Sequence, residues 1–277
     1  MNISPRTISI ITPSFNQAQF LEKNIKSVID QHYPSVEHIV IDGGSTDGTI
    51  DILKKYPHLR WVSEPDRGQT HALNKGFRMA TGEIIGWINS DDGYCPGALK
   101  EISQCFDREQ VSVVYGDGVE VDRDDKTIRP IIPRGISTRE LIEYWKWRYE
   151  YIQASFFFRK NVFETVGYLD EDLYYTMDHD FLIRLSRKYS FTYVPKPLAY
   201  YRMHETSKTG ATHQSIIPKY VWELHRVSKK YWGKPFEWTY YRFLGSFVCG
   251  ILFSVMKNVF FVPGSKSRML TQRLRKS

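Results

Sequence analysis

The sequence predicts an α/β fold, in which a doubly wound and mostly parallel β-sheet carries helices on both faces. Short apolar runs typical of buried strands alternate with helix-like segments through the first hundred residues, which favours parallel strands joined by helices. Several of these runs stop at loops that contain Asp and Gly. The 277 residues, 42% of them hydrophobic, suffice for one large core and a C-terminal extension of helical and aromatic character.

The expected strands are runs of β-branched and other apolar residues that end at Pro, Gly or polar residues. They cover residues 7–12, 36–41, 60–63, 84–88, 111–115 and 191–194. Apolar residues at helical spacing predict helices at residues 21–29, 50–53, 71–81, 97–106 and 177–185. We expect Thr70 and Thr176 to cap the helices that follow them, and Gly116-Asp117-Gly118 to form a turn after a strand.

Asp42, Asp66 and the pair Asp91-Asp92 each follow a predicted strand. Parallel strands end at one edge of a sheet, where open α/β sheets bind ligands, so these loops can share one ligand. The adjacent carboxylates of Asp91 and Asp92 repel each other unless a hard divalent cation, which brings phosphate oxygens with it, neutralises them. A solvated turn is the alternative, and it is the stronger interpretation when residues 89–92 are taken alone. We expect both carboxylates to lie on a surface loop whose fold does not depend on them.

Composition and charge narrow the class of protein. Cys95, Cys105 and Cys249 match no zinc pattern and favour a reducing compartment. The N-terminus lacks a basic region followed by an apolar core, and no run reaches the length of a membrane span, so a cytoplasmic location is expected. Much of the net charge of +7 lies in the last 50 residues, where it fits an anionic membrane surface at least as well as nucleic acid. We therefore expect no nucleic-acid partner.

Five short motifs follow one another in the first hundred residues. They are TPSFN at residues 12–16, IDGGSTDGT at 41–49, LNKG at 73–76, ATGE at 80–83 and NSDD at 89–92. In this order they resemble the signature of family 2 glycosyltransferases, whose GT-A fold is Rossmann-related, and the resemblance covers roughly residues 5 to 205. It implies a GT-A domain at residues 1–215, with a donor half at about 1–118 and an acceptor half at about 119–215. A helical, basic region would follow at residues 216–277.

The resemblance also implies a nucleotide-sugar donor and a divalent cation, Mn2+ or Mg2+. In that family the Asp that matches Asp42 contacts the nucleobase, and the stretch that matches residues 89–92 binds ribose and the metal diphosphate. The implied donor-binding residues are Pro13, Phe15, Asn16, Asp42, Asp66, Asn74, Lys75, Asn89, Asp91 and Gln153. The implied metal ligands are Asp92, Asp91 and His204. Asn89 stands where family members often have Asp, which leaves open which carboxylate touches the metal.

Asp178 lies in the first turn of a predicted helix and matches the catalytic base of the family, although the usual Glu-Asp pair is here Met177-Asp178. A positioned carboxylate can take the proton of a sugar hydroxyl as that hydroxyl attacks the anomeric carbon. The alternative is that Asp178 and Asp180 only complement the helix dipole. Residues 153–159 resemble the strand before the acceptor site, which makes Gln153 a candidate to contact sugar hydroxyls.

The chain changes character after residue 219. Aromatic and basic residues alternate, an apolar stretch at residues 243–262 is interrupted by Lys257, and five basic residues follow position 265. We favour an interfacial helix on an anionic membrane, which would hold the protein at the inner face of the cell membrane. A helix that docks on another subunit of a homo-oligomer is the alternative.

These features predict an inverting, metal-dependent glycosyltransferase that transfers a sugar to a lipid-linked or cell-surface glycan. A sugar nucleotidyltransferase is the first alternative, but such enzymes usually carry a Gly-rich phosphate loop after the first strand, which TPSFN is not. A non-catalytic module that binds membrane or nucleic acid is the second alternative. It predicts that the protein does not hydrolyse a nucleotide-sugar donor.

Overall fold

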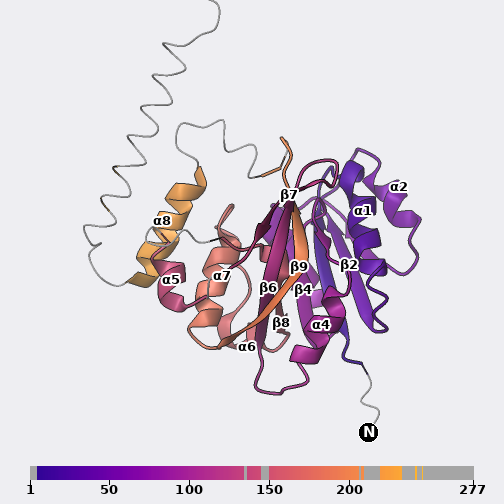
Figure 1. Cartoon of the computed structure of the whole chain (residues 1–277). Coiled ribbons are helices and arrows are strands. Elements are labelled where there is room, and N and C mark those ends of the chain that lie inside the picture. Colours follow the sequence, from indigo (N-terminus) through magenta and orange to yellow (C-terminus); the bar gives the residue numbers. More distant parts are fainter. Residues whose placement is uncertain are drawn as a thin grey trace, which may run out of the picture.

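The computed structural model describes residues 5–133, 136–144, 150–205, 207–208, 219–232, 241 and 245, which Figure 1 shows as one curled sheet flanked by helices. The strand order is β3-β2-β1-β4-β8-β6-β9-β5, with β7 paired to β6. The strands are β1 (Ile8–Ser14), β2 (Val36–Asp42), β3 (Arg60–Ser63), β4 (Ile84–Trp87), β5 (Gly93–Tyr94), β6 (Val113–Val121), β7 (Thr127–Ile131), β8 (Phe156–Arg159) and β9 (Phe191–Arg202). The helices are α1 (Ala18–Ile29), α2 (Thr49–Lys54), α3 (Gln69–Met79), α4 (Ala98–Cys105), α5 (Thr138–Ile142), α6 (Val162–Val166), α7 (Met177–Ser186) and α8 (Lys219–Trp232), with a 3₁₀ turn η1 (Gln153–Ser155).

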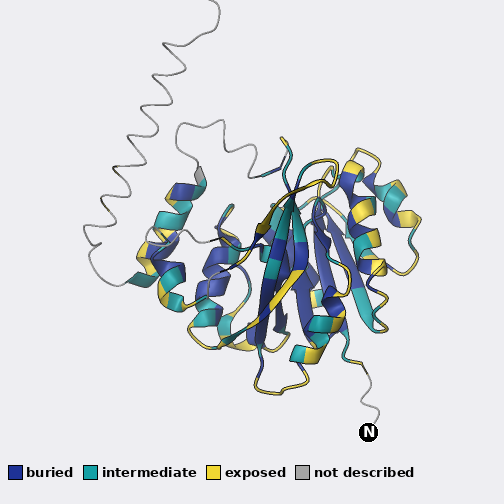
Figure 2. Cartoon of the chain, viewed as in Figure 1, coloured by how far each residue is buried: buried dark blue, intermediate teal, exposed yellow. Residues whose placement is uncertain are grey.

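The first four strands form the parallel part of the sheet. β1 pairs with β2 and with β4, and β2 pairs with β3, all in parallel. β1 is buried along its whole length (Figure 2), and neighbouring residues point to opposite faces. Ile11 belongs to the buried cluster that includes α3 and α7, while Ile10 belongs to the cluster that includes α4. Helices therefore cover both faces, which confirms the predicted doubly wound arrangement.

The other part of the sheet mixes strand directions. β8 is antiparallel to β4 and to β6, whereas β9 is parallel to β6. Near its end β9 also pairs with β5, where Tyr200 lies opposite Gly93. Because Gly93 follows directly after residues 89–92, β9 carries the residues beyond Tyr200 against that loop.

Gly116-Asp117-Gly118 does not form the predicted turn, since β6 continues through these residues. A Cβ atom at Gly116 would lie 2.5 Å from Leu198 Cδ1, and one at Gly118 would lie 2.2 Å from Ile152 Cδ1. The glycines allow side chains from β9 and from the segment before η1 to pack directly on the strand. Close approach of neighbouring chain, rather than a turn, explains these glycines.

Thr70 and Thr176 do not cap the helices beside them, and the cap prediction is wrong. Within the described residues, α3 and α7 begin without a hydrogen bond from a capping side chain. Thr70 Oγ1 instead donates to the carbonyl of Leu173 at 3.0 Å, and Thr176 Oγ1 donates to Glu223 at 3.1 Å. Both hydroxyls bind partners distant in sequence, and these contacts fix the segment before α7 between α3 and α8.

α8 is the described helix of the C-terminal extension, and it lies beside α5 and α7 (Figure 1). Its Val227 is 1% exposed and belongs to the same buried cluster as α7. No helix among the described residues is long and apolar enough to cross a membrane. Apart from Gly245, the apolar stretch at residues 243–262 and the basic tail lie outside the described residues. The membrane and subunit interpretations of that stretch stay predictions.

Candidate active site

The loops that follow β1, β2, β3 and β4 leave the sheet at one edge, because these four strands are parallel. Asp42, Asp66 and Asp91 lie on or at the start of these loops. The predicted common edge for the three Asp-bearing loops is therefore confirmed. The polar side chains at this edge form three groups.

Asp42, at the end of β2, is 1% exposed and organises the loop that follows it. Its Oδ2 accepts hydrogen bonds from the N–H groups of Gly44 and Ser45, at 3.1 and 2.9 Å, and from Ser63 Oγ at 2.6 Å. Ser45 Oγ donates to the other carboxylate oxygen. In this structure the carboxylate therefore holds the loop in shape, and its contact with a nucleobase stays a prediction.

Gly43 lies against the side chains of Phe15 and Asp66. A Cβ atom at Gly43 would lie 2.8 Å from Asp66 Oδ2 and 3.3 Å from Phe15 Cδ2, so any side chain here would displace them. The Phe15 ring is 60% exposed. An exposed aromatic face next to a carboxylate and bare backbone offers stacking and hydrogen bonding to a flat polar ring.

Asn16 joins the loops after β1 and β2. Its backbone has φ 51°, in the left-handed region that Asn tolerates better than most residues. Its Oδ1 accepts a hydrogen bond from the N–H of Thr46 at 2.9 Å, and its own N–H donates to Ser45 Oγ at 2.7 Å. Asn16 therefore fixes the neighbouring Phe15 relative to the loop after β2.

Asp91 and His204, 113 residues apart in the chain, meet at the centre of the edge. His204 Nε2 lies 3.0 Å from Asp91 Oδ2. The His204 side chain is 3% exposed and that of Asp91 is 16% exposed. The imidazole packs on Phe20 of α1 with ring centres 4.5 Å apart. These contacts hold one carboxylate and one imidazole side by side.

Asp92 is not a surface-loop carboxylate, contrary to expectation, because it is only 2% exposed. Its Oδ1 accepts the N–H of Arg202 at 3.0 Å, and its Oδ2 accepts a hydrogen bond from Asn89 Nδ2 at 3.1 Å. Burial and the neighbouring charge of Asp91 raise the pKa of Asp92 well above its usual range. The end of β9 lies directly against this side chain, so Asp92 fastens the loop to the strand.

Asp91 and His204 fit a divalent cation as two of its ligands. Mg2+ and related ions are commonly held by one or two carboxylates and complete their coordination with substrate phosphates and water. Among the described residues, no group of three or more His, Cys, Asp or Glu side chains is arranged to hold a metal alone. Both oxygens of Asp92 accept hydrogen bonds inside the protein, which makes Asp92 the weaker candidate of the predicted three.

Hydrogen bonds lead from residues 89–92 toward α7. Gln69 Nε2 donates to Asn89 Oδ1 at 2.7 Å, and Lys208 Nζ donates to Gln69 Oε1 at 2.9 Å. The Lys208 ammonium also lies 3.9 Å from the centre of the Tyr174 ring. Burial lowers the pKa of Lys208 to about 8, although the charge of Asp178 opposes this effect. A partly buried cation thus lies between the Asp91 loop and α7.

Asp178 lies in the first turn of α7, as predicted. Its Oδ1 accepts a hydrogen bond from the N–H of His179 at 2.8 Å. Burial raises the pKa of Asp178 to about 6, against the opposing charge of Lys208. A carboxylate with this pKa is ionised at pH 7 and is a stronger base than an exposed Asp.

Asp178→Asn is expected to stabilise the protein at pH 8. Folding raises the pKa of Asp178 from 3.8 to about 6, so protonated Asp178 contributes stability that is complete below pH 3.8 and is lost as the pH rises through 6. Asn does not titrate, and the free energy of unfolding of the variant should exceed that of wild type by about 1–3 kcal/mol at pH 8 and by little at pH 4. Urea unfolding at both pH values measures the difference. A variant less stable than wild type at pH 8 would contradict the raised pKa.

The remaining predicted donor residues are bound within the protein. Asn74 is 2% exposed and its amide donates to the backbone before α7 at 3.0 Å, while Lys75 pairs with a glutamate of the loop after β3. Gln153 Nε2 donates to the carbonyl of Trp87 at 3.0 Å, and its Oε1 is buried without a hydrogen-bond partner among the described residues. Pro13 is buried within β1. The donor contacts of these four residues stay predictions.

Sequence reasoning missed the roles of Arg202, Gln69 and Glu223. Arg202 is 1% exposed, and its Nε donates to the carbonyl of Asp91 at 2.8 Å. A charged residue at the end of an apolar strand was the available signal for Arg202. Gln69 and Glu223 carry no local signal, because their partners lie 20 or more residues away in the chain.

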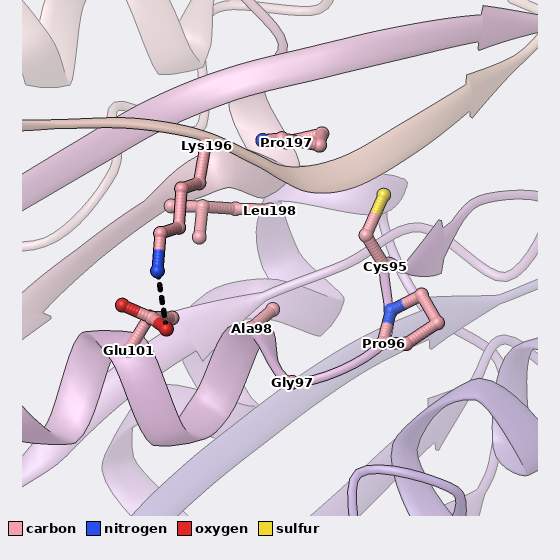
Figure 3. Close-up of a pocket in the computed structure, with 8 residues that line it drawn as sticks. All are labelled: Cys95, Pro96, Gly97, Ala98, Glu101, Lys196, Pro197 and Leu198. Carbon is pink, nitrogen blue, oxygen red and sulfur yellow. Dashed lines mark hydrogen bonds and ion pairs between the residues drawn. The ribbon is translucent and has the colours of Figure 1, made fainter.

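A separate hollow lies between α4 and β9 (Figure 3). It is lined by Cys95, Pro96, Gly97, Ala98, Glu101, Lys196, Pro197 and Leu198. Lys196 Nζ pairs with Glu101 Oε1 at 2.6 Å, and burial raises the pKa of the Cys95 thiol to about 11. Since that thiol is protonated at neutral pH, Cys95 is not suited to act as a nucleophile. The sheet edge is the better candidate for the active site.

Comparison with known proteins identifies the family of this chain. Residues 9–167 match the family described as Glycosyl transferase family 2. An uncharacterized glycosyltransferase of Mycobacterium tuberculosis is 31% identical over 190 residues, which are 65% of this chain and 69% of that protein. An uncharacterized glycosyltransferase of Nostoc sp. is 32% identical over 126 residues, 44% of this chain and 39% of that protein. Bacillus subtilis TuaG, named for teichuronic acid biosynthesis, is 33% identical over 129 residues, 42% of this chain and 51% of TuaG. The matched part thus spans less than two thirds of the Nostoc and Bacillus relatives.

Two solved structures share the fold. S. aureus TarS in complex with UDP-GlcNAc superimposes with a TM-score of 0.65 at 18% identity, over 97% of this chain and 79% of that one. The mannosyltransferase PcManGT from Pyrobaculum calidifontis, in complex with GDP-Man and Mn2+, gives a TM-score of 0.61 at 18% identity, over 99% of this chain and 82% of that one.

The curled sheet flanked by helices is the architecture of a GT-A glycosyltransferase. The family match covers more than half of the chain, and the Mycobacterium relative agrees with it. The chain belongs to glycosyl transferase family 2, as the five sequence motifs indicated.

Proposed function

We propose that the protein is an inverting, metal-dependent glycosyltransferase that moves a sugar from a nucleoside-diphosphate sugar to a hydroxyl group. One observation carries the proposal. Asp91 and His204 are in contact at 3.0 Å. Hydrogen bonds from the Asp91 loop through Gln69 lead to Lys208, whose charge interacts with that of Asp178. The end with Asp91 and His204 suits a diphosphate with its cation, and Asp178 at the other end is suited to accept a proton.

The nucleoside of the donor would bind over Gly43, with its base against Phe15 and Asp66. The exposed Phe15 ring and the bare Gly43 backbone support this orientation. β1 lies between β2 and β4, so a donor with its base here extends along the edge toward residues 89–92. The nucleotide sugars in the TarS and PcManGT complexes support the same class of donor.

The diphosphate would lie near Asp91, His204 and Lys208. A bound Mg2+ or Mn2+ supplies positive charge that stabilises the departing diphosphate. Asp91 and His204 would hold this ion, and Asn89 would contact the ribose or phosphate beside it. Lys208, oriented by its hydrogen bond to Gln69, adds positive charge on the same side of the site.

Asp178 would accept the proton of the acceptor hydroxyl as its oxygen attacks the anomeric carbon and the bond to the diphosphate breaks. Attack from the face opposite the leaving group inverts the configuration at that carbon. The pKa of Asp178, about 6, keeps the carboxylate ionised at pH 7. Transfer should therefore decline as the pH falls below 6.

The proposed acceptor is a lipid-linked or cell-surface glycan, and the similarity to TuaG supports this class. We assign donor binding to residues of about 1–118 and acceptor binding to about 119–215. Gln153 lies beside the end of β4, and its buried Oε1, which has no hydrogen-bond partner among the described residues, is our candidate to bind a sugar hydroxyl.

A panel of nucleotide sugars tests the function. We expect one nucleoside-diphosphate sugar to raise the melting temperature in Mn2+ or Mg2+ but not in EDTA, and to be hydrolysed slowly without acceptor. A sugar nucleotidyltransferase would instead release pyrophosphate from a nucleoside triphosphate and a sugar phosphate. A panel in which no nucleotide sugar binds or is hydrolysed would contradict the proposal.

Gly43→Ala is expected to weaken donor binding by about 5-fold or more, since an overpacking cost of about 1–3 kcal/mol converts to a factor of about 5 to 100. The new methyl group would displace Asp66 and Phe15 from the proposed base site. Thr46→Ala is the matched control, because Thr46 is an exposed residue of the same loop. Calorimetry with the donor compares the two variants. Equal donor affinity in Gly43→Ala and wild type would contradict binding of the nucleobase at this position.

A further inference from the structure

The N-terminus of α7 is closed by a residue of α8. Glu223 Oε1 accepts the N–H of Tyr174 at 3.0 Å, and its Oε2 accepts the N–H groups of Tyr175 and Thr176 at 2.6 and 2.9 Å. Thr176 Oγ1 donates to the same Oε2 at 3.1 Å. One carboxylate thus receives four hydrogen bonds from three consecutive residues, immediately before the helix that carries Asp178.

These bonds hold the three residues that lead into α7, a helix that begins without a capping hydrogen bond from its own N-cap side chain. Hydrogen bonds from backbone N–H groups to an ionised carboxylate are stronger than those between neutral groups. A negative charge at a helix N-terminus also interacts favourably with the helix dipole. Glu223 is therefore suited to fix both the path of residues 174–176 and the direction of the first turn of α7.

Further contacts hold α8 on this segment. Arg226 Nη2 donates to the carbonyl of Asp172 at 2.9 Å, and Tyr231 Oη donates to Asp180 Oδ1 at 2.8 Å. Lys230 Nζ lies 3.2 Å from the same oxygen. α8 is therefore anchored to residues that lie before and after the N-terminus of α7. Glu223 approaches that N-terminus from this anchored helix.

Glu223 also contributes to the charge around Asp178. The charged side chains that act on Asp178 are Lys208, from the segment after β9, and Glu223, from α8. Burial raises the pKa of Asp178 most, Lys208 lowers it, and the negative charge of Glu223 raises it. His179, the next residue on α7, is buried with its pKa lowered to about 4 and is therefore neutral at pH 7.

We propose that Glu223 is a positioning residue for the catalytic carboxylate, and that it orients Asp178 by closing the N-terminus of α7 from the neighbouring helix. The inference rests on the proposed role of Asp178 as the base. It assigns a function to α8, which lies beyond the family match at residues 9–167.

Three variants of the full chain test the inference. Glu223→Gln removes the charge and one strong acceptor, and should lower kcat by about 10- to 100-fold with donor Kd unchanged. The acid limb of its pH profile should move to lower pH, because a charge that raises the pKa of Asp178 is lost. Glu223→Asp keeps the charge but is one methylene shorter, and should lower kcat without moving the acid limb. Tyr231→Phe, which removes a different hydrogen bond between α7 and α8, should lower the melting temperature but keep wild-type kcat and acid limb.

The outcomes are distinct. Wild-type kcat and an unmoved acid limb in Glu223→Gln would overturn the inference, as would a Tyr231→Phe variant that reproduces the effects of Glu223→Gln. If Glu223→Gln does not fold at the assay temperature, Glu223→Asp decides, and wild-type kcat in that variant overturns the inference. A wild-type protein that transfers no sugar from any donor overturns the proposed function itself, and this result appears before any variant is compared.

Discussion

Asp178→Asn is expected to lower the rate of sugar transfer by about 100-fold or more, the usual effect of losing a general base. The amide keeps the shape of the side chain and can still accept the hydrogen bond from the N–H of His179. Donor affinity should stay near the wild-type value, because the proposed donor contacts lie on the loops after β1 to β4 and on the segment after β9. Asp178 is not among them. Single-turnover transfer with saturating donor measures the rate, and calorimetry measures the affinity.

Asp180→Asn is the informative comparison for this variant. Asp180 is fully buried and is bound by Arg184, Lys230 and Tyr231, so its loss should lower stability more than transfer. Near wild-type transfer in Asp178→Asn would show that another group takes the proton. If Asp180→Asn then lost transfer while still folded, the base assignment would pass to Asp180.

Asp91→Ala is expected to weaken metal-dependent donor binding by at least about 100-fold, more than is typical for residues that only support a metal ligand. The variant removes one of the two side chains proposed to hold the cation, and His204→Ala should have a similar effect. The fold should persist, because the Asp91 side chain is partly exposed. Titration of a nucleoside diphosphate in Mn2+ and in EDTA separates metal-dependent from metal-independent affinity.

Asp92→Ala is the matched neighbour, and it should act mainly on stability. Removing its carboxylate leaves the N–H of Arg202 and the amide of Asn89 without their partner, at a cost of about 1–3 kcal/mol in the free energy of unfolding. If Asp91→Ala kept the metal-dependent donor affinity and a stable Asp92→Ala lost it, Asp92 rather than Asp91 would be assigned as the metal ligand.

The parallel half of the sheet could be predicted because its signals are local. The strands β1 to β4 are short and mostly apolar runs. A loop and a helix follow each of β1, β2 and β3, and a loop, the two-residue strand β5 and α4 follow β4. The end of β9 could not be predicted in the same way, since Pro195 and Pro197 interrupt the pattern after Val194. The strand continues because its pairing with β6 shifts register near Pro197, where an irregular ladder tolerates proline.

In the candidate site too, residues with local signals could be predicted, and residues that depend on distant partners could not. Asp178 could be placed in the first turn of α7 from the helical spacing that follows it. The burial of Asp92 could not be foreseen, because the N–H group that it binds belongs to a residue 110 positions away. Glu223 illustrates the same limit, since a glutamate within an amphipathic helix is ordinarily a solvated residue.

β9 links the two halves of the chain more closely than their division at about residue 118 suggests. β9 belongs to the acceptor half and begins beside β6, and the chain at its end brings Arg202 and His204 against the loop that carries Asp91 and Asp92. A fragment that stops before β9 would lack these partners, so the donor loop can reach this shape only after the late-synthesised part of the chain has folded onto it. Recombination between family members is subject to the same constraint. A chimera that joins the first half of one member to the second half of another should bind donor only when the strand end and the loop come from the same parent.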